Sequence, residues 1–322
     1  MSNETATPVL LPADRTLSAD QADRFFLPGA DGVRLAVYAW RWWPTNAPAL
    51  LFGHANGFSA GCYAPLLEQL SRHFRLYAFD ARGHGASEKP TPSAESYAMT
   101  AFGADLQALA GALQVRLPGD LPLHYAAHSL GGMAAVAAGG LPEPGLPFAS
   151  MTLFEPPAYP SPGDPVRKET DAHSRLFVDW AARRVERFAS FEDFLAEAVR
   201  NRAFARFRPD MLAAMASGVL QADPEGGLRL RCPGAVEAAI YGACPGFDPL
   251  PGCARFAMPV LYFNSDPAVA EGRAWMPPVA RRMVARMSRG EYRIMTGCRH
   301  LMVQEDPERC FEAILEGTSR AG

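Results

Sequence analysis

Short apolar runs alternate with longer segments of helical apolar spacing along most of the chain. Consecutive apolar positions are typical of strands that are buried on both faces of a sheet. Apolar residues three and four positions apart are typical of helices that cover such a sheet. The runs predict strands over residues 24–28, 33–40, 49–53, 74–79, 151–154, 259–263 and 292–295, and from residue 123 onward. The helical spacing predicts helices over residues 63–72, 97–113 and 275–287, and a final helix that opens at residues 305–308.

This alternation of strands and helices predicts a mainly parallel sheet that is covered on both faces. The pattern changes over residues 156–257, where helical segments dominate and no convincing run of parallel strands occurs. An insertion of this size is far longer than an ordinary connection, so we expect it to form a substructure of its own. We therefore predict an N-terminal arm over residues 1–23, an α/β core over 24–155 and 258–322, and a helical cap over 156–257.

Composition narrows the class of protein without identifying it. The chain has 322 residues, of which 48% are hydrophobic and 20% charged, and this is typical of a globular core rather than of disorder. The net charge of −3 and the lack of a long basic run do not favour a nucleic-acid partner. No apolar run is long enough to cross a bilayer, and the polar first residues lack a secretory pattern, so we expect a soluble cytoplasmic protein.

The six cysteines show no metal-binding spacing. We expect reduced, mostly buried thiols and no bound metal. The positions of Cys244 and Cys253 leave a bridge between them open.

A serine follows the central apolar run, in the segment Ala127-His128-Ser129-Leu130-Gly131. Small residues two positions on either side allow a tight strand-to-helix turn that exposes the serine Oγ. The amide of Leu130 then lies at a helix N-terminus, directed at any negative charge that develops beside Ser129. The simpler interpretation is a serine that only caps the helix.

A second loop follows the strand over residues 49–53, with the sequence His54-Ala55-Asn56-Gly57-Phe58. Its backbone can turn inward and offer the amide of Asn56 as a second oxyanion donor. We expect the His54 side chain to hold this loop by hydrogen bonds rather than to transfer protons. The next strand ends in a glycine-rich turn that begins at Asp80, where Asp80 and Arg82 are close enough in sequence to pair.

Three polar residues each follow a predicted strand: Ser129, Asp266 and His300. Loops at the carboxyl ends of parallel strands gather at one edge of the sheet, so we expect these side chains to meet there. A neutral histidine can remove the serine proton near neutral pH, and a carboxylate behind it fixes its tautomer.

These residues and motifs resemble the α/β-hydrolase superfamily in its capped form. The likeness covers about residues 24–315 and rests on the His54 loop, the turn from Asp80 to Ser87, the elbow at Ser129, Asp266 after a strand and His300 near the end. The resemblance implies an α/β fold with a mostly parallel eight-stranded sheet flanked by helices and a helical cap inserted after the sixth strand. It also implies Ser129 as nucleophile, His300 as base, Asp266 as acid, and the amides of Asn56 and Leu130 as oxyanion hole. Glu155, which follows the strand over residues 151–154, is the competing carboxylate, because some members of the family take the acid from that place.

The expected activity is therefore that of a cofactor-independent serine hydrolase that cleaves a carboxylic ester through an acyl-enzyme. The apolar cap favours a small-molecule, largely apolar, ester-like substrate. A serine at the elbow argues against haloalkane dehalogenases and epoxide hydrolases, whose pattern has aspartate there. A lactonase, a thioesterase, a carbon–carbon bond hydrolase and a ligand-binding protein with a slow or vestigial triad remain alternatives, because fold alone does not choose among them. The oligomeric state is left open.

Overall fold

The fold is organised by one large sheet of parallel and antiparallel strands. The computed structural model describes residues 21–119, 121–142, 145–161, 163–270 and 276–321, so the predicted arm lies outside the described residues up to position 20. The eight strands pair in the order β1-β2-β4-β3-β5-β6-β10-β11. They are β1 (Ala22–Pro28), β2 (Arg34–Trp40), β3 (Ala49–Gly53), β4 (Arg75–Phe79), β5 (Leu123–His128), β6 (Phe148–Phe154), β10 (Val260–Ser265) and β11 (Gly290–Met295).

Strand direction follows the predicted alternation of strands and helices. β1 and β2 form an antiparallel hairpin, β2 also pairs antiparallel with β4, and every pair from β4 to β11 is parallel. All residues of β3, β5 and β10 are buried, as the consecutive apolar positions predict. The expected mostly parallel eight-stranded sheet is confirmed.

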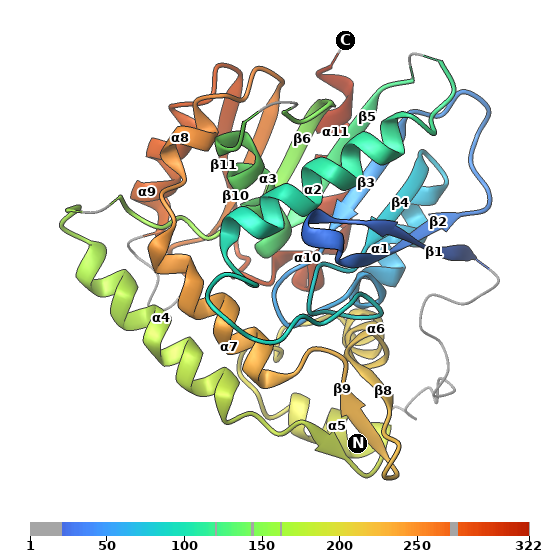
Figure 1. The fold of residues 1–322 in the computed structure, drawn as a ribbon, viewed down its shortest axis with the longest axis vertical. Helices are drawn as coiled ribbons and strands as arrows, with labels where there is room; N and C mark the ends of the chain where they lie inside the picture. Colours follow the sequence, from blue (N-terminus) through green and yellow to red (C-terminus); the bar gives the residue numbers. More distant parts are fainter. Residues whose placement is uncertain (1–20, 120, 143–144, 162, 271–275, 322) are drawn as a thin grey trace, which may run out of the picture.

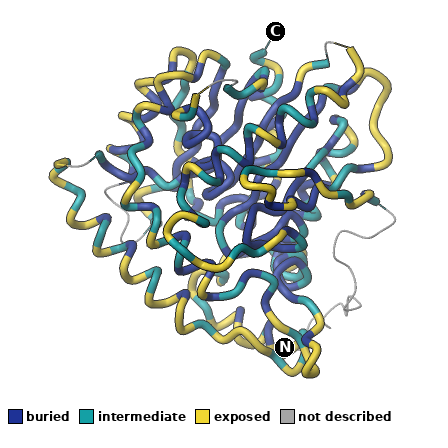
Figure 2. The backbone as a smooth tube through the Cα atoms, viewed as in Figure 1, coloured by how far each residue is buried: buried dark blue, intermediate teal, exposed yellow. Residues whose placement is uncertain are grey.

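Helices cover both faces of this sheet (Figure 1). On one face lie α2 (Met99–Gln114), α3 (Leu130–Gly140) and α9 (Met276–Val284); on the other lie α1 (Ala64–Ser71) and α11 (Pro307–Ser319). α3 is buried all round, consistent with its run of alanines and glycines, and packs beside α2 and β5. The short α10 (Met302–Glu305) precedes α11. Figure 2 shows the strands mostly in the colour of buried residues.

The segment between β6 and β10 is largely helical, as predicted. It contains α4 (Arg167–Ala182), α5 (Phe191–Ala198), α6 (Pro209–Val219), α7 (Gly234–Ala243) and α8 (Leu250–Cys253). α4 and α7 lie side by side (Figure 1), and the outer surface of α4 is exposed (Figure 2). A small antiparallel sheet was not expected; it joins β7 (Arg187–Phe188), β9 (Leu228–Leu230) and β8 (Leu220–Ala222). These strands are too short to give a clear period-two pattern.

Gly131 brings the start of α3 close to the end of β3. A Cβ atom built on Gly131 would lie 2.7 Å from the carbonyl carbon of Gly53, so only glycine fits there. The backbone N–H of Gly131 donates to the carbonyl of His54 at 3.0 Å. The contact therefore fixes the start of α3 against the loop that follows β3.

We expect Gly131→Ala to lower the free energy of unfolding by about 1–3 kcal/mol, because the added methyl group forces two backbones apart. Gly111→Ala on α2 is the matched control, since a Cβ atom there meets nothing within 4 Å. Alanine at position 111 should raise stability by up to ~1 kcal/mol through helix propensity. Denaturant unfolding of both variants measures this difference. Equal stability of Gly131→Ala and the parent protein would show that the close contact is not needed.

Candidate functional site

Ser129 sits on a strained turn between β5 and α3. Its backbone has φ 52° and ψ −110°, which is unusual for a residue with a side chain. The N–H of Ser129 donates to the carbonyl of Phe154 at 2.9 Å, and the carbonyl of Ser129 accepts from Met133 at 3.0 Å. Strain of this kind costs of order 1–3 kcal/mol and persists only where the surroundings hold it. The turn predicted from the small flanking residues is therefore present.

His300 lies in the loop after β11 and contacts Ser129. Its Nε2 is 3.0 Å from the Oγ of Ser129, and its Nδ1 is 2.8 Å from Oε2 of Glu155. An ionised carboxylate only accepts hydrogen bonds, so Nδ1 carries the hydrogen of a neutral ring and Nε2 accepts from the serine hydroxyl. This is the tautomer that can take a proton from Ser129.

Glu155 directly follows β6 and is fully buried. Its Oε1 accepts from the Ser265 hydroxyl at 2.6 Å, the Asn264 amide at 3.2 Å and the Ser265 N–H at 3.3 Å. A buried carboxylate is tolerated only when such donors surround it. The backbone of Glu155 also has positive φ, at 43°, which directs its side chain toward His300. β6 and β10 are neighbours, so their carboxyl ends bring these groups together.

Asp266 does not occupy the position that the sequence predicted for it. Its two carboxylate oxygens accept the backbone N–H groups of Gly297, at 2.8 Å, and Ala268, at 2.9 Å. These hydrogen bonds lower the pKa of Asp266 below its usual range, the bond from Gly297 contributing most. Glu155 stands next to Nδ1 of His300 instead, so the expected Asp266–His300 pair is wrong. Asp266 braces the loop that carries His300.

The two expected oxyanion donors, Asn56 and Leu130, line one cavity together with Ser129 and His300. The loop that carries Asn56 is held by His54, whose Nε2 accepts from Ala81 N–H at 2.9 Å and whose Nδ1 donates to the Ala55 carbonyl at 2.8 Å. Burial lowers the pKa of His54, consistent with a neutral ring. The structural role expected for His54 is thus confirmed, and the roles of the two amides stay predictions.

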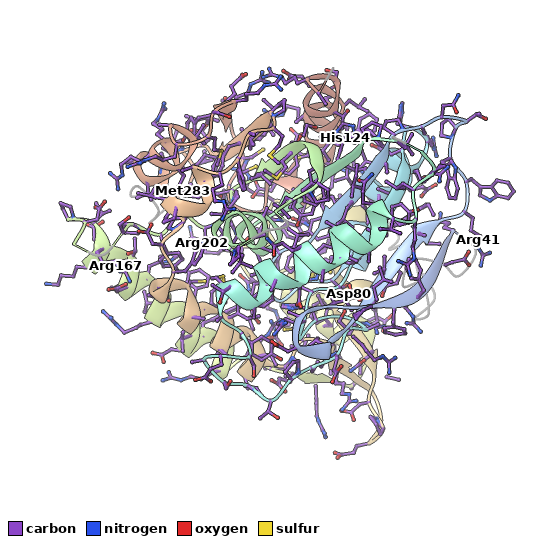
Figure 3. All side chains as sticks on the ribbon, turned by 45° about the horizontal axis from the view of Figure 1, so that its top comes forward. Arg41, Asp80, His124, Arg167, Arg202 and Met283 are labelled. Carbon is purple, nitrogen blue, oxygen red and sulfur yellow. The ribbon has the colours of Figure 1, made fainter. Side chains whose placement is uncertain are left out.

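The glycine-rich turn after β4 uses its charged residues separately. Asp80 (labelled in Figure 3) accepts from the Tyr38 hydroxyl at 2.9 Å and from the N–H groups of Ala60 and Ala86. Arg82 instead binds Asp105 on α2 through two 2.7 Å hydrogen bonds, and both side chains are buried. The expected Asp80–Arg82 pair is therefore wrong, because backbone donors satisfy Asp80 and the planar guanidinium finds a bidentate partner.

The cavity over Ser129 has a volume of about 290 Å³ and lies between the sheet edge and the inserted helices. Most of its wall is apolar, and most of its aromatic side chains come from the inserted segment. They include Phe177 and Trp180 on α4, Phe194 on α5, Phe204 between α5 and α6, and Tyr241 on α7. A second cavity of about 420 Å³ shares Trp180, Arg184, Phe194 and Phe204 with it.

One ion pair lies in the wall of this cavity. Arg184 binds the carboxylate of Glu237 on α7, and both side chains are largely buried. The guanidinium of Arg184 also lies 5.5 Å from the centre of the Trp180 ring. The backbone carbonyl of Glu237 accepts from the Asn56 side chain at 3.3 Å. The pair therefore joins the segment after α4 to α7 without adding net charge, and the Glu237 backbone joins α7 to the loop of Asn56.

All six cysteines are buried free thiols, so no bridge joins Cys244 and Cys253. Within the described residues, no group of three or more His, Cys, Asp or Glu side chains is arranged to hold a metal ion. In the same part of the chain, no helix is both long and apolar enough to cross a membrane.

Comparison with known proteins identifies the family. Residues 50–313 match the sequence profile of the Alpha/beta hydrolase family, which covers more than half of the chain. Together with the sheet order and the strand-to-helix turn at Ser129, this shows that the chain belongs to the α/β-hydrolase family.

Individual relatives are more distant. The chain is 29% identical over 187 residues to a 2-(acetamidomethylene)succinate hydrolase of Mesorhizobium japonicum, a match that covers 57% of this chain and 64% of that protein. It is 29% identical over 93 residues to 3-oxoadipate enol-lactonase 1 of Acinetobacter baylyi, covering 29% of this chain and 32% of that one. Each match spans less than two thirds of the relative's length.

Among solved structures, that of an E-2-(acetamidomethylene)succinate hydrolase superposes with a TM-score of 0.73 at 20% identity. The superposition covers 92% of this chain and 99% of that chain. The likeness at this identity shows the shared fold.

Buried histidines should make the fold sensitive to acid. Burial lowers the pKa of His124, on β5 (Figure 3), from 6.5 to about 4. The unfolded chain therefore binds an additional proton between pH 6.5 and 4, and the free energy of unfolding falls as pH falls through this window. His124→Asn should remove on the order of 2–3 kcal/mol of that loss. Denaturant unfolding at pH 7 and pH 4.5 tests this; an unchanged pH dependence in the variant would contradict it.

Proposed function

We propose that the chain is a serine hydrolase that cleaves a carboxylic ester through an acyl-enzyme, with Ser129 as nucleophile, His300 as base and Glu155 as acid. The observation that carries the proposal is the continuous set of hydrogen bonds from Ser129 Oγ through the two ring nitrogens of His300 to Glu155. The strained backbone at Ser129 and the adjoining cavity support it. No cofactor takes part in this chemistry.

In the first half of the reaction, Ser129 Oγ attacks the ester carbonyl carbon while its proton passes to His300 Nε2. Glu155 stabilises the imidazolium that forms. The amides of Asn56 and Leu130 stabilise the oxyanion, and the loss of one such donor typically costs about 3 kcal/mol of barrier. When the intermediate collapses, the alcohol leaves with the proton from His300. Water then attacks the acyl-enzyme by the same steps and releases the acid.

Replacing the nucleophile and the two candidate acids separates the roles. We expect Ser129→Ala to lower kcat on a p-nitrophenyl ester about 10⁴-fold or more. Glu155→Gln should lower kcat about 10⁴-fold, because the amide favours the wrong tautomer of His300. Asp266→Asn, the matched control, should change kcat by less than about tenfold, since its carboxylate braces a loop. Steady-state kinetics at pH 7.5 gives all three values.

Three results would contradict this proposal. A greater loss of kcat in Asp266→Asn than in Glu155→Gln would return the acid role to Asp266. Retained turnover in Ser129→Ala would end the acyl-enzyme mechanism. A parent protein that binds esters without hydrolysing them would favour the ligand-binding alternative.

The cavity supports a medium-sized, uncharged substrate. Its aromatic wall favours apolar groups, and the Arg184 guanidinium in that wall is already neutralised by Glu237. The relatives' names describe substrates with carboxylate groups, and Arg299 also lines the cavity, which favours a lactone or amide of an acidic compound as the second candidate. The Arg299 guanidinium donates to the backbone carbonyl of Arg202 at 3.0 Å.

Paired substrates decide between these candidates. We expect kcat/KM for p-nitrophenyl butyrate to exceed that for the p-nitrophenyl half-ester of succinic acid at least ~10-fold, because burying a carboxylate against a mostly apolar wall is costly. The two esters share the leaving group and have acyl chains of equal carbon number. A preference for the half-ester that Arg299→Gln abolishes would instead support the acidic substrate.

A further inference from the structure

His128, the residue before Ser129, makes hydrogen bonds through both ring nitrogens. Its Nδ1 is 2.8 Å from the hydroxyl oxygen of Tyr63, and its Nε2 is 2.9 Å from the backbone carbonyl oxygen of His300. The Tyr63 hydroxyl also accepts from the N–H of Ala55 at 3.1 Å. The proposed mechanism does not use the His128 side chain.

The two ends of this series of hydrogen bonds, from Ala55 to His300, fix the direction of each bond in it. The Ala55 N–H can only donate and the His300 carbonyl can only accept. Nε2 of His128 must therefore carry the hydrogen, and in the neutral ring Nδ1 accepts from Tyr63. The Tyr63 hydroxyl thus accepts a hydrogen bond from Ala55 and donates one to His128.

The chain joins parts of the site that are far apart in sequence. Ala55 immediately precedes Asn56, whose amide is a proposed oxyanion donor. The opposite end is the backbone of His300, the proposed base. His128 also directly precedes Ser129 in the chain. One residue is therefore connected to the nucleophile, to the loop of the oxyanion donor Asn56 and to the loop of the base His300.

Water has little access to these bonds. Tyr63 and His128 are both fully buried. The ring of Tyr63 packs against Phe52 and Phe58, with centroids 4.9 and 6.1 Å apart, and meets His128 edge-on at 5.9 Å. A hydrogen bond lost here is not replaced by solvent, so its partner shifts or stays unpaired.

We propose that His128 is a positioning residue for hydrolysis, which holds the Asn56 loop and the His300 loop in register with Ser129. This inference rests on the proposed function. Small displacements of a base or an oxyanion donor matter because the reaction requires near-attack geometry, and a shift of about 1 Å can cost on the order of 100-fold in rate.

Two substitutions divide the roles of the two ring nitrogens. An asparagine amide reaches the place of Nδ1 and retains a partner for Tyr63, but it does not reach the His300 carbonyl. A glutamine amide reaches the place of Nε2 and can still donate to that carbonyl. We expect His128→Asn to lower kcat about 10- to 100-fold with KM nearly unchanged, and His128→Gln to restore most of kcat.

His124→Asn is the matched control. His124 is a second buried histidine on β5, four residues before His128, and its Nδ1 is 2.8 Å from the Ser150 hydroxyl oxygen. It has no place in the proposed reaction. We expect His124→Asn to keep the kcat of the parent protein at pH 7.5 while losing about as much thermal stability as His128→Asn. If His128→Asn does not fold, Tyr63→Phe tests the same chain from its other member, with a smaller expected fall in kcat.

The outcomes are distinct from failure of the proposed function. Retained turnover in Ser129→Ala would remove the mechanism itself, whatever His128 does. With a serine-dependent parent activity, unchanged kcat in His128→Asn would overturn the positioning role. An equal fall of kcat in His124→Asn would also overturn it, because a general loss of stability in β5 would then explain the effect.

Discussion

The buried carboxylate of Glu155 is the constraint around which the site is arranged. A charge without solvent must be surrounded by donors, and Glu155 takes them from two directions: Asn264 and Ser265 on one oxygen, His300 on the other. These contacts fix the ring of His300, and the ring in turn faces Ser129. Both Glu155 and Ser129 have positive φ, so the sheet edge holds two strained residues at adjacent strand ends.

The order of the strands in the sheet brings the residues of the site together. β5, β6 and β10 are parallel neighbours, so Ser129, Glu155 and the donors of β10 emerge side by side. β11 borders β10 and delivers the His300 loop, which Asp266 braces through Gly297. The inserted helices close the apolar cavity above, and the backbone carbonyl of Glu237 on α7 joins them to the Asn56 loop.

Pattern and spacing predicted the strands, the covering helices and the position of Ser129 and His300 well, because consecutive apolar runs and small flanking residues act locally. The acid could not be decided that way. Asp266 and Glu155 both follow strands, and the choice depends on side-chain direction and on donors from a strand more than a hundred residues away. The same holds for the Arg82–Asp105 pair and for the contacts of His128 with Tyr63, whose partners the sequence does not link. The strands of the inserted segment are too short to show the alternation of apolar and polar residues that predicts a strand.

The most direct test of the account is to react the protein with a fluorophosphonate and to map the modified peptide by mass spectrometry. A nucleophile activated by His300 and Glu155 should form a single adduct on Ser129, with loss of hydrolysis in proportion to labelling. Hydrolysis that continues in fully labelled protein, or an adduct on another residue with Ser129 unmodified, would contradict the proposal that Ser129 is the nucleophile.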